Sequence, residues 1–123
     1  MPANVRILEV GADGEGRVDL AALLAELGRR GIRSVMVEGG SQLLTSFMQG
    51  QLAQAAVITI TPRLVGGLGA ISAPLAANGT ALAVTPQLTG VSYTPAGEDL
   101  VVWGDIAWPQ LAAVAKTSQK RSG

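Results

Sequence analysis

The residues with the clearest chemical potential stand together directly after an apolar run at residues 35–37. They are a carboxylate, two glycines and the hydroxyl residue that opens a helical pattern: Glu38, Gly39, Gly40 and Ser41. Glycines let an anion approach the backbone, and the first turn of a helix offers unpaired N–H groups and the positive end of the dipole. This spacing predicts a turn that holds a phosphate. A Gly-Gly pair between a strand and a helix is also common as a simple tight turn, so both interpretations stay open.

The residue types that the sequence lacks narrow the chemistry as well. It contains no Cys and no His, which excludes disulfides, thiolate nucleophiles, imidazole acid–base catalysis and the usual zinc sites. We therefore expect no metal site, and chemistry that uses carboxylates, hydroxyls, backbone groups, Lys, Arg or a bound cofactor. Hydride transfer from a nicotinamide fits this restriction, because the reactive atoms belong to the cofactor and the substrate.

Composition and charge place the chain among globular proteins. Its 123 residues correspond to one domain, and 48% apolar with 15% charged residues describe a chain able to bury a core. Nine Lys and Arg balance nine Asp and Glu, and two Trp, one Tyr and one Phe offer little base stacking. We therefore expect no nucleic-acid partner. With no bilayer-length apolar run and no signal-peptide pattern, we expect no membrane association and a cytoplasmic location.

The elements that must position the glycine turn begin with a β-branched run at residues 5–10, which predicts a strand. Asp19 then caps a predicted helix that ends at Gly31. A leucine stripe at helical spacing gives this helix a core-facing side: Leu20, Leu23, Leu24 and Leu27. Residues 32–37 are mostly apolar on consecutive positions, which predicts a strand covered on both faces.

A second helix is predicted from Ser41 to Gly50, with an apolar side formed by Leu43, Leu44, Phe47 and Met48. Residues 55–61 predict the next strand, which Pro62 ends. The order β-α-β-α-β predicts parallel strands with right-handed crossovers, and ligands collect at the carboxyl ends of such strands. Residues 38–41 and 62–69 are both expected at that edge.

The C-terminal third predicts an antiparallel hairpin at the edge of the sheet. Its strands are residues 87–93 and 100–103, with a turn at 95–98. From Pro109 onward we expect a tail with a short helical piece at residues 110–115. The expected organisation is one domain over residues 1–108 and a tail over 109–123.

Four segments together resemble the C-terminal reductase domain of the riboflavin-biosynthesis protein RibD. They are the strand that ends in Glu-Gly-Gly at residues 31–40, a helix that ends in Gly50, the strand and Pro-x-Leu-x-Gly-Gly run at 59–67, and residues 97–100. The resemblance implies a dihydrofolate-reductase-like fold of the α/β class. That fold has three layers, a mostly parallel sheet with helices on both faces, and a C-terminal antiparallel hairpin.

The resemblance also implies an activity. The family uses NADPH to reduce 5-amino-6-(5-phosphoribosylamino)uracil, a pyrimidine ribose phosphate, to its ribitylamino form, with hydride delivered to C1′ of the sugar. By similarity Glu38 faces the substrate as a catalytic residue, although a carboxylate that braces loop N–H groups is an alternative. By similarity the cofactor contacts come from six residues: Gly39, Gly40, Ser41, Arg63, Gly66 and Gly67. Ser41 is also expected as a helix cap, and Arg63 either faces the 2′-phosphate or is merely solvated.

Two departures from the family pattern qualify this expectation. Gln54 and Ala55 stand where members usually have an acidic pair. A complete reductase domain also has a stretch upstream that carries most of the residues that hold the substrate, and we expect this chain to lack it. Strands whose apolar composition suits burial on both faces would then be left uncovered. We expect a homo-oligomer, in particular a dimer, to cover them. Pairing with a separate N-terminal half is an alternative. A non-catalytic nucleotide-binding module and an assembly domain remain as alternative functions.

Overall fold

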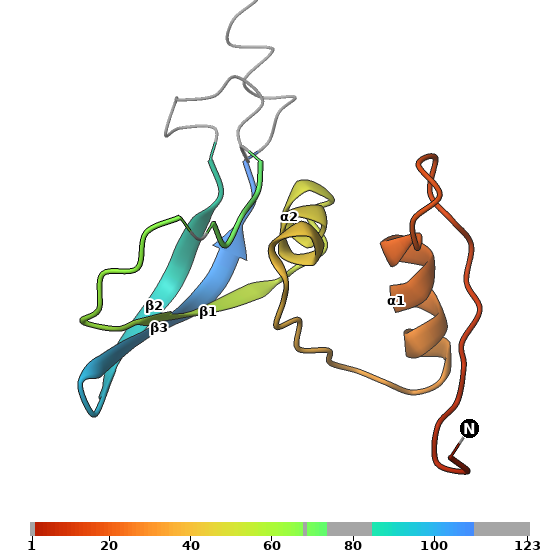
Figure 1. Ribbon diagram of the computed structural model, residues 1–123, viewed down its shortest axis with the longest axis horizontal. Coiled ribbons are helices and arrows are strands. Elements are labelled where there is room, and N and C mark those ends of the chain that lie inside the picture. The colour runs from red at the N-terminus through yellow and green to blue at the C-terminus, as the bar shows by residue number, and fades with distance from the viewer. Residues whose placement is uncertain (1, 68, 74–84, 110–123) are drawn as a thin grey trace, which may run out of the picture. The chain divides into compact units, whose positions relative to one another are not determined.

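The computed structural model describes residues 2–67, 69–73 and 85–109, which fall into two compact units, Met1–Glu38 and Gly39–Gly123 (Figure 1). The helical piece predicted at residues 110–115 lies outside the described residues, as does most of the predicted tail.

The helix of the first unit is α1, Leu20–Arg29, and both of its predicted ends are confirmed. The Asp19 side chain accepts a hydrogen bond from the backbone N–H of Ala22 at 3.0 Å, which satisfies one of the unpaired donors of the first turn. At the other end Gly31 has a φ of 84°, a left-handed conformation that glycine adopts without a steric penalty. The prediction of a core-facing leucine side was wrong, because no residue of α1 is buried.

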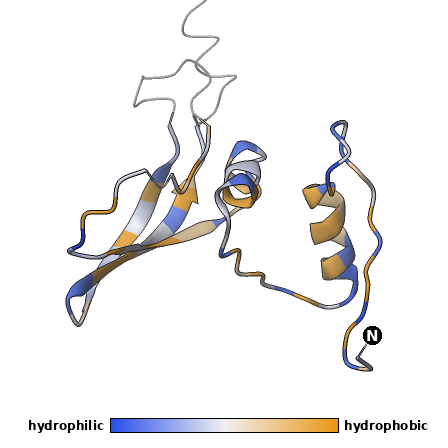
Figure 2. Ribbon diagram, in the orientation of Figure 1, coloured by the Kyte–Doolittle hydropathy of each residue, from blue (hydrophilic) through white to orange (hydrophobic). Residues whose placement is uncertain are grey.

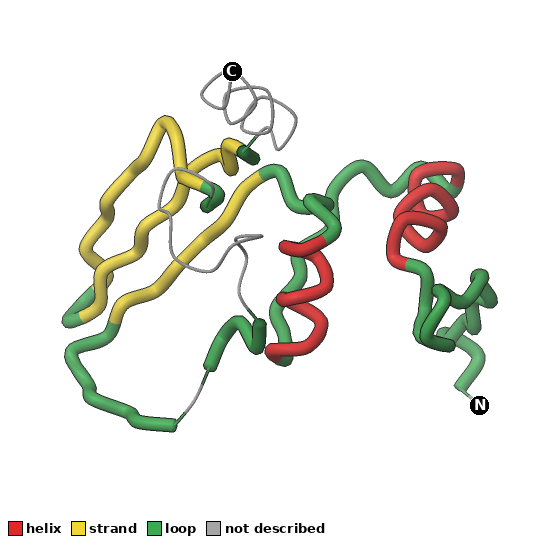
Figure 3. Tube along the Cα trace, turned by 90° about the horizontal axis from the view of Figure 1, so that it is seen from above, coloured by secondary structure: helices red, strands yellow, loops and turns green. Residues whose placement is uncertain are grey.

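Residues 5–10 and 32–37 differ from their prediction as strands. Neither segment pairs with a neighbour, and both are drawn as loop in Figure 3. A β-branched sequence becomes a strand only where an adjacent chain accepts its backbone hydrogen bonds, and no such chain lies beside these segments within the described ranges. Their apolar side chains stay largely in solvent; Met36 is 77% exposed.

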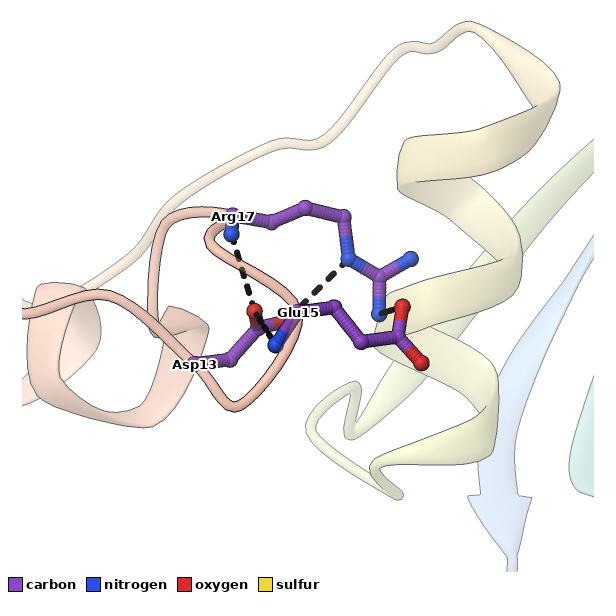
Figure 4. A network of polar contacts seen from close by, with 3 residues as sticks. All are labelled: Asp13, Glu15 and Arg17. Carbon is purple, nitrogen blue, oxygen red and sulfur yellow. Dashed lines mark hydrogen bonds and ion pairs between the residues drawn. The ribbon is translucent and has the colours of Figure 1, made fainter.

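A polar network shapes the loop between the extended segment and α1 (Figure 4). One carboxylate oxygen of Asp13 accepts hydrogen bonds from the backbone N–H groups of Glu15 at 2.9 Å and Arg17 at 2.8 Å. The Arg17 guanidinium pairs with Asp13 at 3.1 Å and with Glu15 at 2.8 Å. These backbone donors, Arg17 first, hold the pKa of Asp13 below its ordinary value. The loop is closed by an antiparallel bridge between Ala12 and Val18.

The second unit begins with helix α2, Ser41–Gln49, which buries Thr45 and Phe47. The predicted apolar side is therefore only partly correct, because Thr45 is buried while Leu43 is exposed. Gly50 is the C-cap, as predicted, but the left-handed residue that follows is Gln51, with a φ of 54°. The backbone N–H of Leu52 then returns to the carbonyl of Phe47 at 2.9 Å, which is the bond that closes a Schellman motif.

The described sheet is antiparallel, with β3, Asp99–Ala107, between β1, Ala55–Ile60, and β2, Gln87–Ala96. The predicted hairpin is confirmed, and its strands are longer than expected. The strands of the described sheet are antiparallel. The parallel pairing beside β1 stays a prediction, because the two segments that were to supply it are unpaired in the described structure. One prediction about this sheet was wrong. Only β2 of the hairpin lies at an edge, because β3 pairs with β1 through six residue pairs from Ala55↔Asp105 to Ile60↔Leu100.

The pairing of β2 with β3 has a bulge and one close backbone approach. A bulge interrupts the β2 ladder between Thr89 and Ser92, and a Cβ added at Gly104 would lie 2.8 Å from the Thr89 carbonyl oxygen. Only glycine fits β3 at that point.

At the end of β3 the Trp108 indole N–H donates to the Ala53 carbonyl at 3.0 Å and the Ile106 N–H to the Gln54 carbonyl at 2.8 Å. Both bonds hold the entrance to β1.

Apolar side chains are poorly covered in the described part of the chain. Phe47, 8% exposed, is the one buried apolar side chain there. Figure 2 shows apolar stretches along the extended residues 5–10 and along the sheet strands. On β1 both faces remain open, and Val57, Ile58 and Ile60 are all exposed. None of the helices in the described ranges has the length and apolar character needed to cross a bilayer.

Candidate functional site

The two glycines of the predicted phosphate turn have different backbone conformations. Gly39 has a φ of 135°, which residues with a side chain rarely adopt. Gly40 has a φ of −79° and a ψ of −167°, an extended conformation that any residue adopts. The peptide bond between them is cis. A Cβ built on either glycine would have no atom within 4 Å, so the described residues leave open space beside this turn.

Gly40 is the N-cap of α2, and this corrects the prediction for Ser41. Ser41 is the first residue of the helix rather than its cap, and no side chain caps the helix within the described residues. The Gly40 carbonyl accepts the first helical hydrogen bond, from the N–H of Leu44 at 3.0 Å. The amide groups ahead of Leu44 therefore have no side-chain acceptor, and the positive end of the helix dipole is uncompensated.

The loop after β1 carries the other predicted cofactor residues. Arg63, Gly66 and Gly67 are all exposed, and Gly67 has a left-handed φ of 77°. Ion pairs in the described ranges use Arg17, Arg29 and Arg30, so Arg63 is not neutralised by a carboxylate among those residues. Its guanidinium is available to an anion, which is what the prediction of a cofactor contact requires.

Glu38 is the last residue of the first unit and directly precedes Gly39. Its side chain is exposed, and no ion pair or hydrogen bond holds it among the described residues. It is adjacent in sequence to the phosphate turn, and its catalytic assignment stays a prediction.

Sequence reasoning missed a contact that links the loop to α2. The hydroxyl of Thr45 donates to the Ser41 carbonyl at 2.6 Å and accepts from the backbone N–H of Ser72 at 2.8 Å. Its oxygen also lies 3.1 Å from the Ser72 hydroxyl. The available signal was a hydroxyl residue inside an apolar helix pattern, which usually marks a local backbone hydrogen bond.

The donor set of this turn fits an anion such as a dinucleotide pyrophosphate. Backbone amides at a helix start without a side-chain cap, beside a glycine that leaves room for phosphate oxygens, are groups that bind phosphate. Arg63, on the loop after β1, is a further group of a kind that binds phosphate. For a metal ion the described residues offer no group of three or more acidic side chains.

Comparisons with known proteins match this chain to one family model and to several relatives. The family model described as the RibD C-terminal domain matches residues 2–102. A relative from Archaeoglobus fulgidus, named 2,5-diamino-6-ribosylamino-4(3H)-pyrimidinone 5′-phosphate reductase, is 42% identical over 62 residues, covering 50% of this chain and 28% of the relative.

Two relatives carry the name riboflavin biosynthesis protein RibD. The one from Chlamydia trachomatis is 42% identical over 62 residues, 50% of this chain and 16% of the relative. The one from Escherichia coli is 34% identical over 65 residues, 53% of this chain and 17% of the relative. The matched part of this chain thus spans less than a third of the length of these relatives.

Proposed function

Because the chain belongs to the RibD C-terminal domain family, we propose that it is an NADPH-dependent reductase of riboflavin biosynthesis. The proposed reaction converts 5-amino-6-(5-phosphoribosylamino)uracil into its ribitylamino form. The name of the Archaeoglobus relative describes a reductase of a closely related pyrimidinone phosphate, which supports a pyrimidine ribose phosphate as the substrate class.

The observation that carries this proposal is the open start of α2 behind Gly39 and Gly40, where no side chain caps the helix within the described residues. This turn lies inside the segment that the family model matches. We propose that the amides of the first turn of α2, with the Ser41 hydroxyl, bind the phosphates of NADPH. Gly66, Gly67 and Arg63 contact the same cofactor, and Arg63 faces its 2′-phosphate.

NADPH, when bound, supplies the hydride that reduces C1′ of the sugar. The proposed part of Glu38 is to accept a hydrogen bond from the substrate and so orient the sugar beside the nicotinamide. Gln54 and Ala55 stand where the family usually carries acidic residues, so Glu38 is the carboxylate on which we place this role.

The assembled domain is proposed to have the three-layer, dihydrofolate-reductase-like architecture with a mostly parallel sheet. Residues 5–10 and 32–37 become strands when they acquire neighbours. The exposed apolar side chains of both segments and of β1 support this proposal, because such surfaces are normally covered in a soluble protein. A homodimer is the proposed assembly.

Two measurements test the function. In the first, NADPH fluorescence is followed during titration with the protein; saturable binding is expected, and its absence would favour an assembly domain. In the second, NADPH consumption is followed with the phosphoribosylamino-uracil and, separately, with the diamino-pyrimidinone phosphate. Consumption with either substrate supports a reductase, whereas binding without consumption identifies a non-catalytic nucleotide-binding module.

The role of Glu38 is tested by Glu38→Gln. If the carboxylate orients the substrate, turnover falls at least about tenfold, which corresponds to about 1.4 kcal/mol of transition-state stabilisation, while the NADPH dissociation constant changes by less than about twofold. Glu98→Gln, in the turn between β2 and β3, is the matched control and should leave both quantities unchanged. Equal losses of turnover and NADPH affinity in Glu38→Gln would instead indicate a carboxylate that braces the loop.

A further inference from the structure

Thr45 is buried in the second turn of α2, with 5% of its surface exposed, and is the one buried polar residue among those described. Its hydroxyl oxygen forms hydrogen bonds with two parts of the second unit that are far from each other in the sequence. On one side it donates to the Ser41 carbonyl at 2.6 Å, within its own helix. On the other side it meets Ser72, which follows the loop after β1.

The hydrogen-bonding capacity of this hydroxyl is fully used. A threonine hydroxyl has one proton and two acceptor positions. The proton goes to the Ser41 carbonyl, so one acceptor position takes the Ser72 N–H at 2.8 Å and the other takes the Ser72 hydroxyl at 3.1 Å. Serine at position 45 can make all three bonds, whereas valine, which has nearly the same shape, can make none.

The Ser72 contact holds the chain that leaves β1 at Ile60 against α2. Residues 61–67 of this loop are exposed throughout, and within the described ranges no hydrogen bond holds Arg63, Gly66 or Gly67 to other residues. The loop is therefore restrained at β1 on one side and at Thr45 on the other. The same Thr45 hydroxyl is bonded to Ser41 in the first turn of α2.

We propose that Thr45 is a positioning residue that ties the loop carrying Arg63 and Gly67 to the first turn of α2, so that both engage one bound NADPH. This inference rests on the proposed function. Because the contact between Thr45 and Ser72 already restrains the loop, the loop loses less conformational entropy when the cofactor binds. Neither the family match nor the names of the relatives assign a role to this residue.

The first test measures NADPH affinity in matched variants. Thr45→Val should weaken NADPH binding about fivefold, because the loop is then no longer held to α2. Thr45→Ser should restore affinity to within about twofold of the unchanged protein, since it keeps the hydroxyl. Thr94→Val, an exposed substitution on β2, controls for the loss of a threonine hydroxyl elsewhere and should have no effect.

The second test reads the loop directly and needs no activity. Trypsin cleaves after the exposed Arg63, and cleavage after the exposed Arg33 in the other unit serves as an internal reference. Mass spectrometry of the fragments should show that Thr45→Val raises cleavage at Arg63 relative to Arg33 several-fold without NADPH, whereas Thr45→Ser does not. A general loss of folding would raise both cleavages together and leave their ratio unchanged.

The two tests separate the possible failures. If Thr45→Val matches the unchanged protein in either NADPH affinity or the cleavage ratio, or if Thr45→Ser fails to restore them, the tie does not position the loop. If the unchanged protein itself shows no saturable NADPH binding while the cleavage ratio responds as expected, the proposed function fails and the tie is only structural, which also overturns the role in cofactor binding.

Discussion

Gly39 and Gly40 meet different physical requirements although they are neighbours. Gly39 needs the freedom of glycine because its φ of 135° is unfavourable for residues with a side chain. Gly40 has an extended backbone that alanine or aspartate also adopts, and a Cβ there would have open space. Its own conformation therefore does not require glycine, whereas close approach of the proposed cofactor to the backbone would.

Gly40→Asp is predicted to change stability and affinity in opposite directions. Aspartate is a better N-cap than glycine, so the free energy of unfolding should stay equal or rise by a few tenths of a kcal/mol. NADPH affinity should fall at least about tenfold, because a carboxylate would then stand where the proposed site places the phosphate oxygens. Calorimetric unfolding and NADPH titration measure the two effects. The control Gly40→Ala adds no charge and should change affinity less; unchanged affinity in Gly40→Asp would contradict the phosphate turn.

At the residue scale the sequence predicted the position of the turn better than its details. The glycines and the start of α2 were located correctly, because glycine conformation and helix periodicity are local properties. Ser41 was assigned as the cap, but the cap is Gly40, since helix boundaries inferred from sequence shift by a residue. The Thr45 contact was missed because Ser72 is 27 positions away, and no local pattern encodes such a pairing.

Among the elements, α1 and α2 end in the same motif with different residues at the left-handed position. Gly31 follows α1 with a φ of 84°, and Gln51 follows α2 with a φ of 54°. In both motifs the next N–H returns to a helix carbonyl, from Ile32 to Leu27 at 3.1 Å and from Leu52 to Phe47 at 2.9 Å. The second motif therefore places a side chain where glycine is favoured.

This difference predicts two substitutions with opposite signs. Gly31→Ala should lower the free energy of unfolding by about 1 kcal/mol, because alanine is strained at that φ. Gln51→Gly should raise it by about 0.5 kcal/mol, since relief of the strain exceeds the added entropy of glycine in the unfolded chain. Urea unfolding followed by circular dichroism measures both. A stability loss in Gln51→Gly would mean that the Gln51 side chain makes a favourable contact in solution.

Two carboxylates predict how stability of the first unit depends on pH. The pKa of Glu26 is lowered by a hydrogen bond from the Arg30 guanidinium at 2.9 Å and by the charge of Arg29. The pKa of Asp13 is lowered by backbone N–H donors. Both carboxyl groups bind protons more tightly in the unfolded chain than in the folded one. Their contribution to the free energy of unfolding is therefore present above the ordinary carboxyl pKa of about 4 and is lost as the pH falls through the lowered pKa values.

Helix content and loop order should therefore decrease below about pH 4. Circular dichroism between pH 2 and 7 measures the change, and amide hydrogen exchange follows the Asp13 loop. Glu26→Gln should make the loss of circular dichroism signal at low pH less steep, whereas Glu9→Gln, on the extended segment, should leave that loss unchanged. Because these groups are exposed, added salt should reduce the ion-pair part of the effect. If the signal loss at low pH were equally steep in Glu26→Gln, the Glu26 carboxylate would be excluded as its cause.

The strand predictions show which elements can be inferred from sequence. The hairpin of β2 and β3 was found because its strands pair with each other across a short turn. Residues 5–10 and 32–37 have the composition of strands, but a strand also requires a neighbour, and sequence does not state whether one is present. Composition thus located β-prone segments correctly and did not decide their pairing.

At the scale of the whole molecule, we place the proposed homodimer contact at β1, which among the described residues pairs with β3 on one side alone. The mass in solution should be twice 12.5 kDa, measured by light scattering across a range of concentrations with and without NADPH. Val57→Lys on β1, at a side chain 61% exposed, should shift the protein toward the monomer because it places a charge at the contact. The matched variant Tyr93→Lys on β2, at a side chain 68% exposed, should not. A monomer at every concentration would exclude the homodimer.

The burial of Phe47 alone among the described apolar side chains has a thermodynamic consequence. If the proposed homodimer supplies most of the contact that excludes water, folding and association would occur in one step, and the melting temperature would depend on protein concentration. Dilution would then act on this protein as a denaturant does on others, and in a cell the synthesis level would set the fraction that is folded.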